Sequence, residues 1–283
     1  MDLTEIRKHV ITALFSDDVL MERFVLKGGS ALELIHGIVS RGSIDVDLSI
    51  QDDIDDAEDT ERRVFHVLKD RFDSVGMVVF DEKFSIIPEQ TPDDIRPWWG
   101  GYQVEFKLIE RQKWEEMKRD RERMRIQAHV IDSRQGRKFR VEISKFEFCG
   151  GKVKASLDEY AIYVYTPAMC AVEKLRAICQ QMREYPHLIN KRARARDFYD
   201  ICAIITQLGI DLSLPENLEL TRNVFAAKKV PLALIPRIPL YCEFHRADWD
   251  AVRDAVVGKV LEFDYYFDFV VSESWKLHPL WKK

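Results

Sequence analysis

The sequence is poor in cysteine, and its few cysteines have none of the spacings that bind metals or build disulfide frameworks. There are five, an odd number, with no Cys-x-x-Cys pair, and they stand mostly in apolar surroundings. Such a set is typical of reduced thiols in a protein core and not of a secreted, disulfide-stapled domain. We therefore expect a cytoplasmic protein.

Long hydrophobic runs and an excess of positive charge are also missing. No stretch approaches the ~18 consecutive apolar residues of a membrane-spanning helix, and residues 1–15 carry charges where a signal peptide would be apolar. We expect no membrane association and no secretion. The formal net charge of -5 excludes a global attraction to nucleic acid, so any such binding must come from a local basic patch.

What the chain does contain is enough apolar material for a large folded core. Its 283 residues, 46% of them hydrophobic, suffice for one large or two modest domains. Apolar residues alternate as in strands before Thr166-Pro167, a helix start, and follow a helical period after it. These patterns predict a mixed α/β core, a β-sheet with flanking helices, over residues 1–165 and a mainly helical C-terminal domain over 166–283.

The segment Lys27–Leu48, KGGSALELIHGIVSRGSIDVDL, combines a tight turn with a pair of carboxylates. A short apolar run ends at Gly28 and Gly29, which tolerate positive φ, so a strand is predicted to turn sharply there. Ser30 is predicted to cap a helix over residues 31–36. The amide groups at the start of that helix favour an anion such as a phosphate.

The carboxylates of this segment are Asp45 and Asp47. On a strand they would share one face about 7 Å apart, while Ile44, Val46 and Leu48 face the core. Two carboxylates at that spacing can share a pair of divalent ions, which activate an attacking oxygen and stabilise a leaving pyrophosphate. Taken alone, Asp-x-Asp is more often the solvent face of an amphipathic strand.

A two-metal site needs a third carboxylate on an adjacent strand. Glu142 is the candidate, because it points outward from a strand predicted over Phe139–Ser144. Glu105, on a strand predicted over Tyr102–Ile109, and Glu147 are rivals on similar faces. The structural alternative for each is a cross-strand ion pair.

These motifs resemble a known family. Lys-Gly-Gly-Ser followed by Arg-x-Ser-x-Asp-x-Asp resembles the first motif of the DNA polymerase β-like nucleotidyltransferases, and more closely the AbiEii/AbiGii toxin family. The strand context VEIS around Glu142, the helix EKLRA at Glu173–Ala177 and RARDFYDI at Arg194–Ile201 extend the likeness. Residues 202–283 carry no motif of that family.

The resemblance implies roles for named residues. Asp45, Asp47 and Glu142 would be the metal ligands. These three residues, with Lys174 and Asp197, would be the catalytic residues. Lys174 would be a point charge for the triphosphate, oriented by Asp197, and an arginine of the second motif would grip phosphate bidentately. The nucleotide-binding set implied is Lys27, Gly28, Gly29, Ser30, Ser43, Lys174, Arg194 and Arg196. Without the resemblance, the two helical motifs would be ordinary helices with ion pairs.

The function implied is Mg²⁺-dependent transfer of a nucleoside monophosphate from an NTP to an acceptor hydroxyl, with two Mg²⁺ ions and release of pyrophosphate. The setting implied is the toxin half of a bacterial toxin–antitoxin or phage-defence (abortive infection) pair. Its partner would be a separate AbiEi-like antitoxin, and its acceptor tRNA or another RNA. The alternatives are transfer to a small molecule or protein, and a non-catalytic nucleotide- or RNA-binding module.

Two basic segments are candidates for contact with such an RNA. One is a local basic set on which a polynucleotide acceptor would have to dock, composed of Arg192, Arg194, Arg196, Lys228 and Lys229. The other is a helix predicted over Lys113–Arg125, dense in charges of both signs, which we interpret as a solvated face in preference to a polynucleotide contact.

Overall fold

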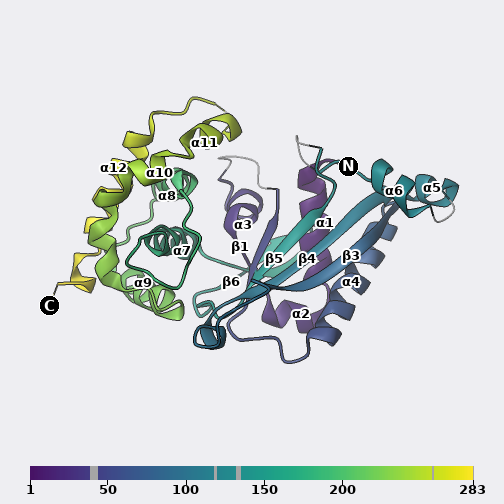
Figure 1. Cartoon of the computed structure of the whole chain (residues 1–283), viewed down its shortest axis with the longest axis horizontal. Coiled ribbons are helices and arrows are strands. Elements are labelled where there is room, and N and C mark those ends of the chain that lie inside the picture. The colour runs from purple at the N-terminus through teal and green to yellow at the C-terminus, as the bar shows by residue number, and fades with distance from the viewer. Residues whose placement is uncertain (39–43, 118–119, 132–134, 257, 283) are drawn as a thin grey trace. The chain divides into compact units, whose positions relative to one another are not determined.

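The computed structural model describes residues 1–38, 44–117, 120–131, 135–256 and 258–282. The chain forms two compact units (Figure 1). Unit 1 comprises Met1–Ala31 and Ser43–Val164, and unit 2 comprises Leu32–Gly42 and Tyr165–Lys283. The mixed α/β core and the helical C-terminal region expected from the sequence are both confirmed.

Unit 1 is built on a seven-stranded mixed sheet in the order β3-β4-β5-β2-β1-β7-β6. The β2–β5 and β1–β7 pairs are parallel, and the other neighbours are antiparallel. The strands are β1 (Val25–Lys27), β2 (Val46–Ser49), β3 (Met77–Ile87), β4 (Gly101–Glu110), β5 (Phe139–Ser144), β6 (Val153–Leu157) and β7 (Tyr160–Val164). The predicted strand over Phe139–Ser144 is confirmed, and β4 exceeds its predicted range by one residue at each end.

Helices α1 (Leu3–Leu14) and α4 (Ala57–Asp73) pack against each other and cover one face of this sheet (Figure 1). The alternation of β2 and β4 sends Val46, Leu48, Val104 and Phe106 into a fully buried core. The intervening residues point to the opposite face, which we call the open face. The other helices of unit 1 are α2 (Asp18–Arg23), η1 (Arg96–Trp98), α5 (Arg111–Glu116) and α6 (Arg121–Gln127); α3 (Gly28–Leu34) begins in unit 1.

Three local predictions were wrong. The helix predicted over Lys113–Arg125 is divided into α5 and α6, because Asp120 caps a new helix start. Strand β2 begins at Val46, after a bend at Asp45, so Ile44 is 41% exposed instead of facing the core. Helix α3 begins at Gly28, because a φ of +66° at that residue lets the chain turn from β1 directly into the helix. Ser30 therefore lies within the first turn, where its hydroxyl donates to the carbonyl oxygen of Asp45 at 3.1 Å.

Unit 2 is a helical assembly in which α7 packs on α8 and α9, and α12 packs on α8. An aromatic cluster that includes Phe198, Phe263 and Phe267 joins α8 to α12. The helices of unit 2 are α7 (Pro167–Gln180), α8 (Ala195–Leu208), α9 (Pro215–Ala227), η2 (Leu232–Tyr241), α10 (Cys242–Arg246), α11 (Trp249–Ala255), α12 (Phe263–Trp275) and η3 (His278–Leu280). Of the helices that the structure describes, none is long and apolar enough to cross a membrane.

Candidate functional site

A row of four polar side chains crosses the open face of unit 1. Lys27 on β1 lies opposite Asp47 on β2, Asp47 lies opposite Glu142 on β5, and Glu142 lies opposite Gln103 on β4. Residues directly opposite each other in a sheet point to the same face. The strand register thus brings Asp47 and Glu142 together, although 95 positions separate them in the sequence.

Gly28 makes the closest backbone approach to this row. A Cβ atom at this position would lie 2.3 Å from Oδ2 of Asp47 and 3.0 Å from its Cγ. Its φ of +66° also favours glycine. Only a residue without a side chain therefore lets the Asp47 carboxylate lie against the first turn of α3.

Glu142 lies in an environment that opposes its ionisation. Burial raises the pKa of Glu142, the carboxylates of Asp47 and Asp45 raise it further, and Lys27 and Arg140 partly offset them. A divalent cation would relieve this repulsion, and carboxylate oxygens are the ligands that Mg²⁺ prefers. Among the described residues no three His, Cys, Asp or Glu side chains already converge on one point as a metal site.

The two rival carboxylates are engaged in ion pairs, Glu105 with two cations outside the row and Glu147 with Lys27 of the row. Glu105 accepts from Lys138 and Arg140, each at 3.2 Å; burial opposes its ionisation, but these two cations hold the pKa of Glu105 below its usual range. Glu147 is buried and lies 3.9 Å from Nζ of Lys27. Both form structural ion pairs, which leaves Glu142 as the carboxylate beside Asp47. Ser43, the remaining predicted residue of this segment, lies outside the described residues.

In unit 2, the two helical motifs meet in a buried charge cluster. Lys174 on α7 donates through Nζ to Oδ1 of Asp197 at 3.1 Å and to Oδ2 of Asp200 at 2.7 Å, both on α8. All three side chains are at most 8% exposed. Sequence reasoning missed Asp200, although its i, i+3 spacing from Asp197 places both carboxylates on one helix face.

The start of α8 is fixed by residues from the C-terminal region, which carried no sequence motif. The backbone N–H of Arg194 donates to Nδ1 of His245 at 3.1 Å, and that of Ala195 donates to Oδ1 of Asp248 at 3.0 Å. Burial lowers the pKa of His245 to about 4, so at neutral pH this imidazole is uncharged and Nδ1 can accept. The tail therefore supports the second helical motif.

Asp197 sits between Lys174 and the first arginine of that motif. Nε of Arg194 lies 2.9 Å from its Oδ2. Burial by itself would raise the pKa of Asp197, but Arg194 and Lys174 outweigh it and hold the pKa well below its usual range. Asp197 is thus ionised and orients two cations at the start of α8.

The basic set predicted around this motif is only partly exposed. Arg192 and Arg196 are exposed and Arg194 is half-buried. Lys228 is only 5% exposed, so its assignment to an exposed basic set was wrong. The reason is tertiary: Lys228 directly follows α9, which packs on α7.

The approach of Gly28 to Asp47 gives a testable prediction. Gly28→Ala should lower nucleotidyl transfer by roughly 10²-fold, because the new methyl group displaces the Asp47 carboxylate and a 1 Å misplacement can cost that much. Kinetics at saturating NTP, with thermal unfolding measured alongside, would check this.

The matched control is Gly76→Ala. Gly76 has a similar φ of +75°, but a Cβ atom there meets nothing within 4 Å. The Gly76→Ala variant should lose only about 1–2 kcal/mol of unfolding free energy, because a side chain is placed in the left-handed backbone region, and it should keep its activity. Equal activity losses in the two variants would contradict a positioning role for Gly28.

Comparison with known proteins places this geometry in a family. A family model described as "Nucleotidyl transferase AbiEii toxin, Type IV TA system" matches residues 9–272. The fold is similar to the crystal structure of JHP933 from Helicobacter pylori, with a TM-score of 0.52 at 14% identity over 98% of this chain and 90% of that one. It is also similar to the crystal structure of a "putative nucleotidyltransferase" from H. pylori, with a TM-score of 0.51 at 14% identity over 97% and 92% of the two chains. No curated protein matches the sequence.

Proposed function

The chain belongs to the AbiEii family of nucleotidyl transferase toxins of type IV toxin–antitoxin systems, and from this premise we propose that it transfers a nucleoside monophosphate from an NTP to an acceptor hydroxyl in a Mg²⁺-dependent reaction. The observation that carries the proposal is the β2–β5 register, which sets Asp47 beside Glu142, with Gly28 against the Asp47 carboxylate. Family membership implies an antitoxin partner and an NTP co-substrate with a divalent metal.

In this proposal the carboxylates of Asp45, Asp47 and Glu142 would hold two Mg²⁺ ions. When bound, the metal would lower the pKa of the acceptor hydroxyl and stabilise the charge on the departing pyrophosphate. We assign Glu142 to the acceptor side of the site, where as a metal ligand it would hold the ion that lowers the pKa of that hydroxyl. Lys27, a member of the row, donates through Nζ to Oγ of Ser144 at 3.1 Å.

We assign the phosphates of the NTP to the basic start of α8. Arg194 and Arg196 lie at its first turn, where guanidinium groups can grip phosphate oxygens bidentately and the helix dipole favours an anion. Asp197 orients Arg194, and Lys174 adds its charge to the same cluster. In unit 1, the amides of Gly29 and Ser30 at the start of α3 are a separate candidate for binding an anion such as a phosphate.

The finer assignments rest on the family resemblance. They are tRNA, or another RNA, as the acceptor and phage defence as the biological setting. Each is part of the proposal and has its own test, because an acceptor is identified chemically and a defence role is identified by phage plating on cells that carry the toxin with its antitoxin.

The test of the reaction itself is a labelling assay. The protein is incubated with each of the four α-³²P-labelled NTPs, Mg²⁺ and total RNA, and the expected result is labelled RNA and released pyrophosphate, both abolished by EDTA. Label on a small molecule or protein would keep the reaction and change the acceptor. If neither label transfer nor pyrophosphate appears with any acceptor, the protein is a non-catalytic binding module.

A further inference from the structure

A line of basic side chains runs from Glu142 along the open face of unit 1. Arg140 precedes Glu142 by two residues on β5, so the two share a face, and Arg140 is one of the cations that act on the pKa of Glu142. Its Nε lies 3.2 Å from Oε1 of Glu105, and Nζ of Lys138 lies 3.2 Å from Oε2 of the same carboxylate. The buried Glu105 thus fixes two cations next to the row formed by Lys27, Asp47, Glu142 and Gln103.

The line continues along β4 to α6. Lys107 follows Glu105 by two residues on the same face, and its Nζ lies 2.9 Å from Oδ2 of Asp81. Oδ2 of Asp81 also lies 2.7 Å from Nε of Arg125, and its Oδ1 lies 3.6 Å from Nη1 of Arg121. We call this line the basic track; its members are Lys107, Arg121, Arg125, Lys138 and Arg140.

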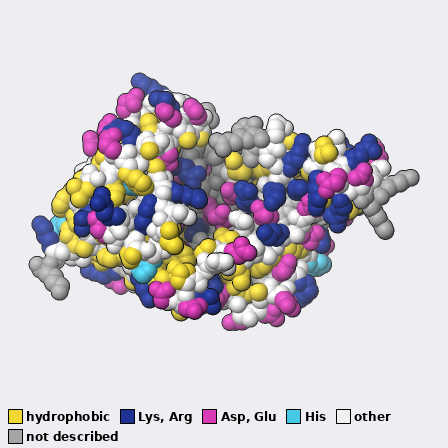
Figure 2. Space-filling model, viewed as in Figure 1, with side chains coloured by type: hydrophobic (Ala, Val, Ile, Leu, Met, Phe, Trp, Pro, Cys, Tyr) yellow, Lys and Arg dark blue, Asp and Glu magenta, His cyan; other side chains and the backbone are white. Residues whose placement is uncertain are grey.

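The basic track carries more positive than negative charge and reaches solvent. Besides Glu105 and Asp81, only Glu122, which lies 2.6 Å from Arg125, pairs with one of its members within the described residues. With Glu142, on which Arg140 acts, five cations therefore face four carboxylates. Four members are between 44% and 57% exposed, Lys107 being the exception. Figure 2 shows Lys and Arg side chains gathered over β4 and β5 and toward α6, although the chain as a whole has a net charge of -5.

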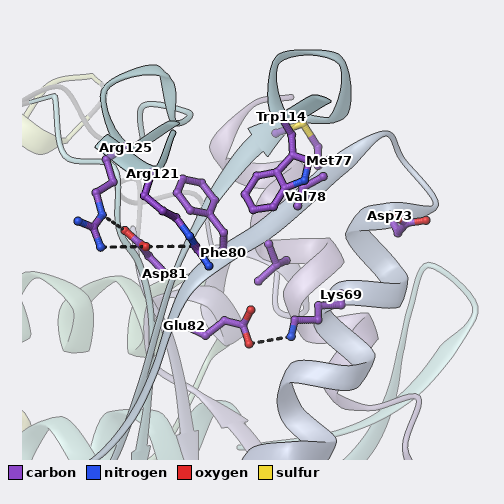
Figure 3. Close-up of a pocket in the computed structure, with 11 residues that line it drawn as sticks. Lys69, Asp73, Met77, Val78, Phe80, Asp81, Glu82, Trp114, Arg121 and Arg125 are labelled. Atoms are coloured by element: carbon purple, nitrogen blue, oxygen red, sulfur yellow. Dashed lines mark hydrogen bonds and ion pairs between the residues drawn. The ribbon is translucent and has the colours of Figure 1, made fainter. Parts of the chain in front are cut away.

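A cavity of about 710 Å³ adjoins the far end of the basic track. Figure 3 shows Phe80 and Trp114 on its wall, with Arg121 and Arg125 held by Asp81. The two ring centroids are 5.6 Å apart, and the guanidinium carbon of Arg121 lies 5.8 Å from the centroid of Trp114. Phe80 is only 2% exposed, in an apolar cluster against which the partly buried Trp114 packs, so Trp114 beside the guanidinium groups is the ring available to an unstacked nucleobase next to its phosphate.

We propose that unit 1 binds a single-stranded polynucleotide along the basic track, with its phosphates on the lysines and arginines and a base against Trp114. This proposal deepens the proposed function. It rests on that function in one respect, which is that the bound polymer is the acceptor and its end reaches Glu142. Regularly repeated phosphates explain why the cations form a line, and a base explains an aromatic cavity at its end. Whether the polymer is RNA or DNA is decided by comparing the two.

The test uses the full-length protein, without NTP or metal, and a fluorescently labelled oligo(U) RNA beside the matching oligo(dT). The variant is Lys138→Gln with Arg121→Gln, because these two members are the most exposed, at 53% and 57%, and leave Arg140 and Arg125 to hold Glu105 and Asp81. The matched control, Arg23→Gln with Arg62→Gln, removes the same charge from exposed sites on α2 and α4.

We expect the track variant to bind RNA roughly tenfold more weakly at ~50 mM salt. Its slope of log affinity against log salt between ~50 and ~200 mM should fall by about 1.4, since each phosphate contact to a single strand contributes about 0.7. The control variant should bind as the unmodified protein does. Trp114→Leu should weaken binding without changing the slope, because stacking releases no counterions.

The proposal is overturned if the track variant binds as tightly as the unmodified protein, or if poly-L-glutamate binds as tightly as RNA, which would indicate an acidic protein partner. Because the assay needs no catalysis, its outcome is independent of the proposed reaction. Absence of nucleotidyl transfer together with a lost RNA interaction in the track variant would reject the reaction and keep the track. If the track variant and the unmodified protein label RNA equally and bind it equally, the reaction is kept and the basic track is rejected as the binding surface.

Discussion

Replacing Asp47 with Asn is expected to reduce nucleotidyl transfer roughly 10³-fold while the protein stays folded. Metal stabilisation of the transition state is worth several kcal/mol, and about 4 kcal/mol corresponds to that rate loss. The amide is isosteric with the carboxylate, so it still fits against Gly28, where a side chain at position 28 would lie 2.3 Å from Oδ2 of Asp47. Initial rates over a Mg²⁺ titration, with thermal unfolding measured in parallel, would check both parts.

The same assay separates the candidate third carboxylates. Glu142→Gln should lose activity to a similar extent, since Glu142 is the register partner of Asp47. Glu105→Gln is the matched control: it lies on the same face, but its carboxylate is held by Lys138 and Arg140. It should lose about 1–3 kcal/mol of unfolding free energy and most of its activity should survive. An inactive Glu105→Gln beside an active Glu142→Gln would show that the third carboxylate was assigned to the wrong strand.

Replacing Lys174 with Met is expected to lower the free energy of unfolding by about 3–5 kcal/mol, the cost of removing one partner from a buried ion pair. Lys174 lies between Asp197 and Asp200 at 3.1 and 2.7 Å, and its removal leaves two buried carboxylates without their shared cation. The effect is larger than a nucleotide contact alone would explain. Urea unfolding of the isolated protein, without NTP, would measure it.

Two further variants test this reading of Lys174. Arg253→Met removes an arginine whose partner Asp250 is 85% exposed, and it should change stability by under ~1 kcal/mol. Combining Lys174→Met with Asp200→Asn should restore most of the lost stability, because Asp197 keeps Arg194 at 2.9 Å as its partner and the second buried carboxylate charge is gone. If Lys174→Met alone is as stable as the unmodified protein, Lys174 does not stabilise the fold and its role is limited to contact with the nucleotide.

Local patterns in the sequence were sufficient for the elements and for the motif that carries the chemistry. The alternation in Phe139–Ser144 predicted β5, and the outward position of Glu142 followed from its parity on that strand. The Thr166 cap before Pro167 predicted α7. Such signals are local because a strand needs only alternate apolar residues and a helix start needs only a cap and a tolerant first turn.

The same local reasoning failed where a backbone path or burial depended on distant residues. The start of α3 at Gly28 and the bend at Asp45 are coupled, since the Ser30 hydroxyl donates to the Asp45 carbonyl oxygen instead of capping. Lys228 looked like an exposed cation and is buried. No local pattern encodes either fact, because each depends on what packs beside the residue.

The sequence by itself determined which carboxylates, glycines and basic residues this protein has and on which faces of their elements they lie, because side-chain direction follows from the periods of strand and helix. Only the tertiary structure decided which of them meet. The parallel register of β2 and β5 selected Glu142 over Glu105 as the neighbour of Asp47, and the packing of α7 on α8 joined Lys174 to Asp200. Contacts between elements far apart in the chain depend on register and packing, which the periodicity of any one segment does not contain.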